Sequence, residues 1–216
     1  MKYFKQEDEF KLESYAKENS TTIPKYLDEL ERISHLNTNS GRMVSGWEQG
    51  RILSTISKMI RPKSILEIGT FTGYSALCLA EGLQNGGQLI SLDINPEWNK
   101  IAKKYINQSP YHDSIKLIIQ DALEYLLKDK SHYDLIFIDA DKERYSQYFE
   151  ICLDLLNSGG FLLADNVLWS GKVLHENPDK TTASIIEFNR MVCQNTRVEN
   201  FILPIRDGIN IIRKLQ

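Results

Sequence analysis

The stretch SILEIGTFTGYSALCLA, residues 64–80, decides the fold. It begins with a short apolar run that is typical of a buried strand, turns at Gly69 and Gly73, and continues into a helical pattern. The glycine spacing differs from a dinucleotide fingerprint, which needs glycines where this chain has Phe71 and Tyr74. A phenylalanine at the middle position keeps the backbone away from a pyrophosphate, so the loop argues against NAD or FAD.

The rest of the chain continues this alternation of strand and helix. Strand-like runs occur at 88–94, 115–121, 133–141 and 160–167, and helical patterns occur at 74–84, 97–107, 121–129 and 143–156. This alternation predicts a parallel sheet with helices on both faces. Near the C-terminus, two strand-like runs flank Asp207-Gly208, a hairpin signal that adds an antiparallel pair at one edge. The sequence therefore predicts an α/β fold with a Rossmann-like, doubly wound, mostly parallel seven-stranded sheet.

The first 60 residues have a different character, because helical spacing of apolar residues dominates them. The run SGWEQGRILSTISKMI, residues 45–60, starts with Ser45 and Glu48 at the spacing of a capping box. We therefore predict one domain over residues 1–216, with a helical N-terminal extension at 1–60 and a Rossmann-like core at 63–216.

Composition narrows the class of protein. The net charge is −3 and the pI is near 5.9, so there is no overall basic footprint for nucleic acid. Cys78, Cys152 and Cys193 are far apart and form no CxxC motif, which favours a reducing compartment. The sequence has no apolar signal core at its N-terminus and no apolar run of about 20 residues. We expect a soluble, cytoplasmic protein without membrane association.

Polar residues at the predicted strand ends indicate a nucleoside site, because ligands of such sheets bind beyond the carboxyl ends of the strands. Asp93 lies about 20 residues past the glycine loop, where an acid can accept hydrogen bonds from ribose. A nucleoside without a diphosphate fits, and we expect S-adenosylmethionine with its methionine portion near Glu67, Gly69 and Ser75. The alternative is that Gly69 is only a turn residue and Asp93 a helix cap. Asp121 is explained equally well as a helix cap or as part of an adenine site.

The fourth and fifth predicted strands end in IDADK (138–142) and ADNVLW (164–169). Asp139, Asp165 and Asn166 could converge there, and two carboxylates with an amide oxygen suit Mg²⁺ or Ca²⁺ better than Zn²⁺. The alternative is that the two acids are caps and Asn166 a turn residue. Lys142 lies beside this predicted cation, whose charge would lower the lysine pKa and let it act as a base. Trp169 follows the motif directly.

As a set, these motifs resemble those of the cation-dependent class I S-adenosylmethionine O-methyltransferases. That family includes the animal catechol enzymes, the plant caffeoyl-coenzyme A enzymes and many bacterial relatives. ILEIGTFTGYSALCLA (65–80) resembles the family's cofactor loop, IDADK and ADNVLW its metal motifs, and RMVSGWEQGRIL (42–53) its N-terminal cofactor-contacting segment. The resemblance covers about residues 40–216.

The resemblance implies a role for each matching residue. It assigns Mg²⁺ to Asp139, Asp165 and Asn166, and removal of the acceptor proton to Lys142. It assigns S-adenosylmethionine to Met43, Ser45, Glu67, Gly69, Thr70, Ser75, Asp93, Asp121, Ala122, Asp139 and Asp141. It places Trp169 and Ser170 near the substrate. The chain departs from the pattern at Ser170, at Phe201 or a neighbour, and at Gln120, which replace an asparagine, an acid and a glycine of various relatives.

Three functions remain open on the sequence. The first is methylation of a small phenolic substrate with vicinal hydroxyls, such as a catechol or caffeoyl compound. The second is methylation of 5-hydroxyuridine in tRNA, against which the acidic pI counts. The third is a non-catalytic module that binds a metal or nucleoside. A homodimer is expected by analogy with the family, and the polar segment 170–184 is predicted to be a loop over the site mouth.

Overall fold

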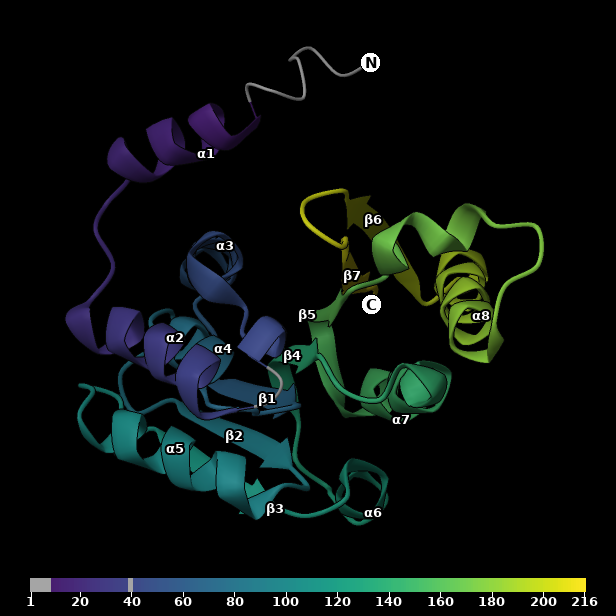
Figure 1. The fold of residues 1–216 in the computed structure, drawn as a ribbon. Coiled ribbons are helices and arrows are strands. Elements are labelled where there is room, and N and C mark those ends of the chain that lie inside the picture. The colour runs from purple at the N-terminus through teal and green to yellow at the C-terminus, as the bar shows by residue number, and fades with distance from the viewer. Residues whose placement is uncertain (1–8, 39–40) are drawn as a thin grey trace.

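The computed structural model describes residues 9–38 and 41–216 and confirms the predicted fold class (Figure 1). A seven-stranded sheet has the order β3-β2-β1-β4-β5-β7-β6. Its strands are β1 Ser64–Ile68, β2 Gln88–Asp93, β3 Ile115–Ile119, β4 Tyr133–Ile138, β5 Leu156–Asp165, β6 Val198–Leu203 and β7 Ile209–Lys214. β1 to β5 pair in parallel, whereas β7 is antiparallel to both β5 and β6. The predicted edge hairpin around Asp207-Gly208 is therefore confirmed.

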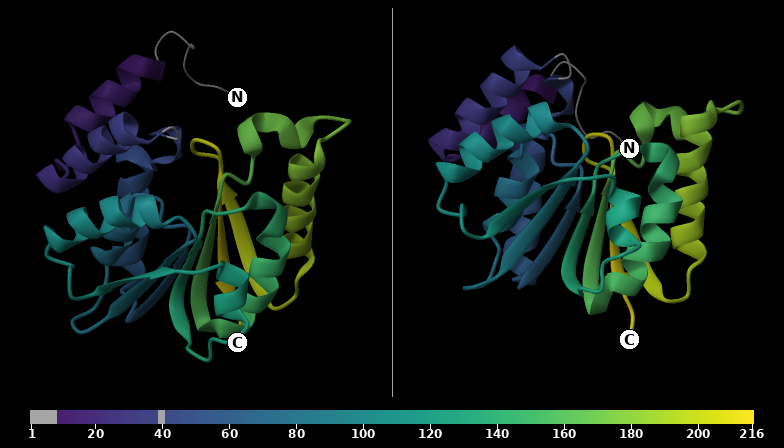
Figure 2. Two further views of the ribbon diagram at one scale, coloured as in Figure 1. Left: turned by 60° about the horizontal axis from the view of Figure 1, so that its bottom comes forward. Right: turned by 90° about the horizontal axis from the view of Figure 1, so that it is seen from below.

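The helices cover both faces of this sheet (Figures 1 and 2). The α-helices are α1 Glu9–Glu18, α2 Lys25–Asn37, α3 Gly46–Ile60, α4 Tyr74–Ala80, α5 Pro96–Asn107, α6 Ala122–Leu126, α7 Tyr145–Leu155 and α8 Lys180–Gln194. Shorter 3₁₀ helices are η2 Gly41–Met43, η3 Lys142–Arg144 and η4 Trp169–Leu174. α2 to α5 pack on one face and α6 to α8 on the other, while α1 lies apart from the sheet in Figure 1.

Two apolar cores result from this layering. On one face, Leu53 of α3 and Phe137 of β4 are fully buried, and on the other Ile136 of β4 and Phe149 of α7 are fully buried. Consecutive residues of a strand point to opposite faces, so a strand between two cores needs apolar residues at successive positions. The last four residues of β4, LIFI in the sequence YDLIFI, meet this requirement.

The connection from β1 to α4 brings two strand ends into close contact. Gly69 has a φ of +103°, and a Cβ at this position would lie 1.9 Å from the backbone oxygen of Asp139. The Asp139 backbone N–H also donates to the Ile68 carbonyl at 2.8 Å. The absence of a side chain at Gly69 therefore lets the end of β4 approach the first loop.

The capping box predicted at Ser45 and Glu48 is wrong. Ser45 precedes α3 but has helical backbone angles, φ −57° and ψ −36°, and its side chain makes no capping hydrogen bond. A capping serine needs a more extended backbone to reach the free amides of the first turn. Here the chain enters α3 from the 3₁₀ helix η2, which does not provide that geometry.

The loop predicted at 170–184 is also wrong in part, since it contains most of η4 and the start of α8. The side chain of Asp179 caps α8 by accepting from the Thr182 amide at 2.7 Å. Ile185, Phe188 and Val192 then bury one face of the helix. This helical spacing is present in the sequence, but the polar and proline-containing residues before it obscured where the helix begins.

The predicted helical extension at 1–60 corresponds to α1, α2, η2 and α3, although residues 1–8 and 39–40 lie outside the described part of the chain. Within residues 9–38 and 41–216, no helix combines the length and apolar character that crossing a membrane requires.

Candidate active site

A cavity of about 810 Å³ opens at the carboxyl ends of the parallel strands. It is lined by residues that follow each of the strands β1 to β5, together with residues from η2, α3 and the loop between β6 and β7. The predicted site residues that line it are Met43, Ser45, Gly69, Thr70, Ser75, Asp93, Asp121, Ala122, Asp139, Asp141, Lys142, Asp165, Asn166 and Trp169. Glu67 and Ser170 are not among its lining residues.

Asp93 joins the first loop to the end of β2. Its Oδ2 accepts from the Phe71 amide at 2.7 Å, and its Oδ1 accepts from the Asn95 amide at 2.8 Å. Burial raises the pKa of Asp93, although backbone amides oppose the shift. The side chain of Asn95 caps α5, so the suggestion that Asp93 is the helix cap is wrong. Each carboxylate oxygen of Asp93 keeps a further lone pair that could accept from a ribose hydroxyl.

Glu67 is fully buried and is not exposed to the cavity. One carboxylate oxygen, Oε2, accepts from the Ser91 hydroxyl, whereas Oε1 has no hydrogen-bond partner among the described residues. Burial raises the pKa of Glu67 to about 8, against the influence of the nearby hydroxyls of Ser75 and Ser91. A buried carboxyl with one free oxygen is a polar group that a cationic part of a ligand could satisfy.

Glu67→Gln is expected to flatten the dependence of stability on pH. The pKa of Glu67 lies above its usual value in the folded state, so the folded protein holds an extra proton between about pH 4.5 and pH 8. Its contribution to stability is therefore present below pH 4.5 and lost as the pH rises to 8, at a rate on the order of 1.4 kcal/mol per pH unit. Urea unfolding at pH 5 and pH 9 measures this: relative to the wild type, the free energy of unfolding of the variant should be higher at pH 9 than at pH 5. Parallel stability curves would contradict this expectation.

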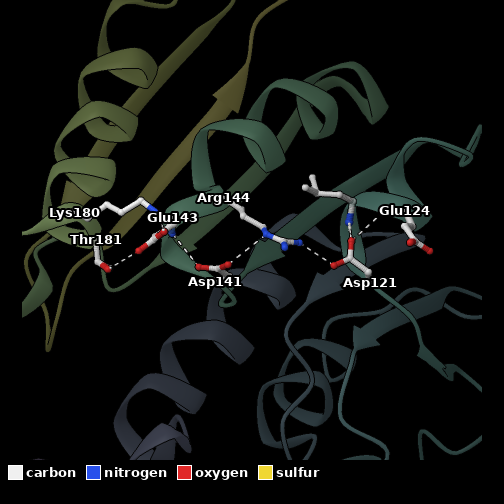
Figure 3. Close-up of polar contacts among 8 residues, drawn as sticks. Asp121, Glu124, Asp141, Glu143, Arg144, Lys180 and Thr181 are labelled. Atoms are coloured by element: carbon white, nitrogen blue, oxygen red, sulfur yellow. Dashed lines mark hydrogen bonds and ion pairs between the residues drawn. The ribbon is translucent and has the colours of Figure 1, made fainter.

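Asp121 and Asp141 are joined by Arg144, as Figure 3 shows. Arg144 Nη1 donates to Asp121 Oδ2 at 2.8 Å, and Arg144 Nε lies 3.3 Å from Asp141 Oδ2. Asp121 also caps α6 by accepting from the amides of Leu123 and Glu124. The cap is therefore confirmed, and Asp121 lines the cavity as well, so it can serve both purposes. This ion-pair bridge links the ends of β3 and β4.

A second set of contacts in Figure 3 attaches α8 to η3. Glu143 of η3 accepts from the side chains of Lys180 and Thr181, the first two residues of α8. Lys180 is largely exposed, so this ion pair contributes little to stability on its own. Thr181 lines the cavity, and these contacts therefore bring the start of α8 to the site.

Asp139, Asp165 and Asn166 all line the cavity, as predicted. Asp165 is almost fully buried, and its Oδ2 accepts from the Gln49 side chain of α3 at 2.6 Å. Burial and the neighbouring charge of Asp139 raise the pKa of Asp165. Neither acid acts as a helix cap in the described structure, so that alternative is wrong for both. Asn166 has a φ of +57°, a conformation common in turns.

The described residues hold no group of three His, Cys, Asp or Glu side chains able to bind a metal. The predicted third ligand, Asn166, is an amide, so this finding leaves the mixed carboxylate and amide set as a prediction.

Lys142 is the buried cation of the site. Its Nζ donates to Asp139 Oδ1 at 2.8 Å and to the Tyr145 hydroxyl at 2.6 Å. The Tyr145 hydroxyl in turn lies within hydrogen-bond distance of the Asp165 and Ile138 carbonyls, at 3.0 and 3.2 Å. Burial alone would lower the pKa of Lys142, but the charge of Asp139 and the contact with Tyr145 raise it above its usual value. The predicted lowering of this pKa depends on a bound cation, and it therefore stays a prediction.

The two residues predicted to face the substrate are placed differently. Trp169 lines the cavity. Ser170 is exposed, and its backbone amide donates to the side chain of Asp207. Among the residues that sequence reasoning missed are Gln49, Arg144 and Arg206, which line the cavity, and Tyr145, which orients Lys142. Gln49 lies inside the segment RMVSGWEQGRIL, and Tyr145 lies three residues after IDADK. Arg206 directly precedes the hairpin signal Asp207-Gly208.

The fold and the cavity together define a class of enzyme. The sheet places the loop after β1, the acid at the end of β2, a buried lysine and two further carboxylates around one cavity. The model of the O-methyltransferase family matches residues 17–215. The chain therefore belongs to that family and is an S-adenosylmethionine-dependent O-methyltransferase.

Similar proteins include catechol and caffeoyl-CoA enzymes. Catechol O-methyltransferase domain-containing protein 1 of Mus musculus is 33% identical over 190 residues, which are 85% of this chain and 72% of that protein. Caffeoyl-CoA O-methyltransferase of Populus kitakamiensis is 33% identical over 220 residues, covering 94% and 93% of the two chains.

Solved structures agree with the fold. Podospora anserina methyltransferase PaMTH1, bound to SAH, superposes with a TM-score of 0.90 at 26% identity and covers 100% of this chain and 99% of its own. The Bacillus cereus O-methyltransferase in complex with SAH has a TM-score of 0.87 at 26% identity, covering 94% and 97%.

Proposed function

We propose that this enzyme transfers the methyl group of S-adenosylmethionine to one hydroxyl of a small aromatic compound with two adjacent hydroxyls, in the presence of Mg²⁺. The observation that supports this most directly is the position of Lys142. Its buried amine lies in a cavity that also contains Asp139, Asp165 and the glycine loop. The similarity to enzymes named for catechol and caffeoyl-CoA adds support for the acceptor class.

The residues present fit the methyl donor. Asp93 offers acceptors to ribose hydroxyls, and it lines the same cavity as Gly69 and Thr70 of the first loop. Ser75 lines the cavity next to the buried Glu67, whose free oxygen suits the cationic end of a methionine group. The donor supplies an electrophilic methyl group, and these residues would hold it next to the acceptor.

The residues also fit a divalent cation. Asp139 raises the pKa of the buried Asp165, which means that the two carboxylates repel each other. Carboxylate and amide oxygens are ligands that Mg²⁺ accepts, and Asn166 supplies the amide. Asp139, Asp165 and Asn166 would therefore hold the ion, which would supply Lewis acidity toward an ionised hydroxyl.

Lys142 would take the proton from the acceptor hydroxyl. In the structure, its charge is stabilised mainly by Asp139. If Asp139 engages another positive charge, Lys142 loses that counter-ion, and its burial then favours the neutral amine. Tyr145 keeps the amine in place through its hydroxyl at 2.6 Å. The deprotonated oxygen then forms a bond to the methyl carbon as the carbon–sulfur bond breaks, and positioning supplies much of the rate enhancement.

The test is methyl transfer from labelled S-adenosylmethionine to catechol and to resorcinol, whose hydroxyls are not adjacent. Each acceptor is offered with Mg²⁺, with EDTA, and with EDTA followed by excess Mg²⁺. We expect label in catechol only, its loss with EDTA and its return with Mg²⁺. Bulk tRNA from a methylation-deficient host is offered in parallel.

The other outcomes are informative. Label that persists in EDTA would contradict the cation requirement. Equal labelling of resorcinol would contradict the need for adjacent oxygens. Label in tRNA alone would move the acceptor to a nucleoside, and no label with retained SAH binding would favour a non-catalytic protein.

A further inference from the structure

Arg206 lies in the loop between β6 and β7, and this loop is fixed against the segment that follows Asn166. In the sheet, Ile209 is paired with Asp165. Beyond the sheet, the Val167 and Leu168 amides donate to the carbonyls of Gly208 and Asp207 at 3.1 and 2.9 Å. These bonds continue the pairing of the two segments past the end of β5. They hold the loop beside the end of the cavity that contains Asn166 and Trp169, and Arg206 is among the lining residues.

The backbone of Arg206 is in an unfavourable conformation. Its φ is +52°, in the left-handed region where glycine is favoured over arginine. Asn166 and Trp169, which also line the cavity, have φ values of +57° and +48°. Asn166 is of a residue type that adopts this region readily, but for Arg206 and Trp169 it is unusual. Strained residues tend to gather where a ligand or a reaction requires a particular side chain.

Arg206 also differs from the other cations of the cavity in its charge balance. Lys142 is paired with Asp139, and Arg144 is paired with Asp121 and Asp141. The Arg206 side chain forms no ion pair or hydrogen bond within residues 9–38 and 41–216. The nearest acidic side chain that the structure indicates is that of Glu31, on the other side of Gly46. A Cβ built on Gly46 would lie 3.2 Å from Glu31 Oε1 and 3.7 Å from Arg206 Nη1.

Among the described side chains that line the cavity, Arg206 is therefore the cation that an incoming anion could pair with. Five carboxylates line it, those of Asp93, Asp121, Asp139, Asp141 and Asp165. An acceptor with its own negative charge would be repelled by them unless a cation offsets the repulsion. A guanidinium suits this task, because its planar array of donors matches the two oxygens of a carboxylate.

We propose that Arg206 recognises a carboxylate on the methyl acceptor, so that the preferred substrates are aromatic acids with adjacent hydroxyls rather than neutral catechols. This inference rests on the proposed function and specifies the substrate class of the same site. Arg206 acts here on specificity and takes no part in proton transfer.

The test compares two acceptors of nearly equal shape, 3,4-dihydroxybenzoate and 3,4-dihydroxybenzyl alcohol. Binding is measured by calorimetry with SAH and Mg²⁺ present, and turnover is measured with S-adenosylmethionine. Arg206→Gln is expected to weaken binding and raise KM for the benzoate by about 10- to 100-fold, the range for a hydrogen bond to a charged group. The alcohol should change by less than about twofold, well below the effect of such a bond.

Two variants control for structure. Arg61 is likewise exposed and has a φ of +54°, but it caps the end of α3 away from the cavity lining. Arg61→Gln should leave both acceptors unchanged. Arg206→Gly relieves the backbone conformation, so it should lose the preference for the benzoate without a loss of thermal stability.

Several results would overturn the inference. Equal effects of Arg206→Gln on both acceptors, or no effect on either, would remove the role in specificity. Weaker SAH binding in the variant would instead assign Arg206 to the carboxylate of the methyl donor. Loss of tRNA binding with unchanged benzoate binding would assign it to a phosphate. If the wild type binds the benzoate through Arg206 but methylates neither acceptor, the proposed function fails while the recognition of a carboxylate stands.

Discussion

Replacement of Lys142 by methionine is expected to lower kcat for a catechol acceptor by about 10²- to 10⁴-fold, the usual contribution of a general base. Methionine keeps much of the volume of the lysine chain but cannot accept a proton. The donor-binding part of the cavity, around Asp93 and the glycine loop, has no contact with the lysine amine among its hydrogen bonds. The affinity for SAH should therefore stay within about twofold, a change too small to report the loss of a hydrogen bond. Single-turnover rates and SAH titration calorimetry measure the two quantities separately.

Two further variants sharpen this prediction. Lys142→Arg keeps a positive charge but cannot be deprotonated in a protein, so it should be nearly as inactive as the methionine variant. Lys63→Met removes an exposed lysine at the opposite end of the sheet, before β1, and should keep full activity. Substantial activity in Lys142→Arg would show that the lysine supplies charge rather than a base.

Replacement of Gly69 by alanine is expected to lower the free energy of unfolding by about 2–6 kcal/mol, the combined range for backbone strain and overpacking. The added Cβ would lie 1.9 Å from the Asp139 oxygen and 2.7 Å from its carbonyl carbon. Both atoms belong to the backbone, so no side-chain rotation can remove the clash. Urea unfolding, followed by far-UV circular dichroism, measures the change.

Gly86→Ala is the matched control for the backbone conformation. Gly86 has a φ of +75°, and a Cβ there would meet no atom within 4 Å. Its replacement should therefore lower the free energy of unfolding by about 1–2 kcal/mol, the effect of the left-handed conformation alone. If the two variants lose equal stability, the close contact between Gly69 and Asp139 is not important.

The sequence was sufficient for the centre of the sheet because β1, β4 and the second half of β5 are buried on both faces. The apolar residues of β1, β4 and the second half of β5, and the polar residues that follow them, locate both the core and one rim of the cavity. The wide agreement between predicted and observed cavity residues follows from that rule, since the carboxyl ends of adjacent parallel strands must meet. Their chemical roles stay predictions, because position alone does not decide which group they bind.

Other features depend on contacts between distant parts of the chain, which no local pattern reports. The bond from Gln49 to Asp165 spans 116 positions, and the ion pair of Arg144 with Asp121 spans 23. Ser45 failed as a cap because the chain reaches it from a 3₁₀ helix with helical backbone angles, which the spacing of Ser45 and Glu48 does not reveal. Arg206 looked like an ordinary loop residue, since neither its backbone angle nor its lack of a partner is visible in a sequence.

The hydrogen bond from Gln49 to Asp165 has a consequence for how this chain can evolve. Gln49 belongs to the helical extension, whereas Asp165 ends a central strand of the core. Both side chains are buried, so the carboxylate would lose its donor if α3 were exchanged for a helix from elsewhere. The extension is therefore not an interchangeable module, and inheritance should preserve it together with the core as one unit.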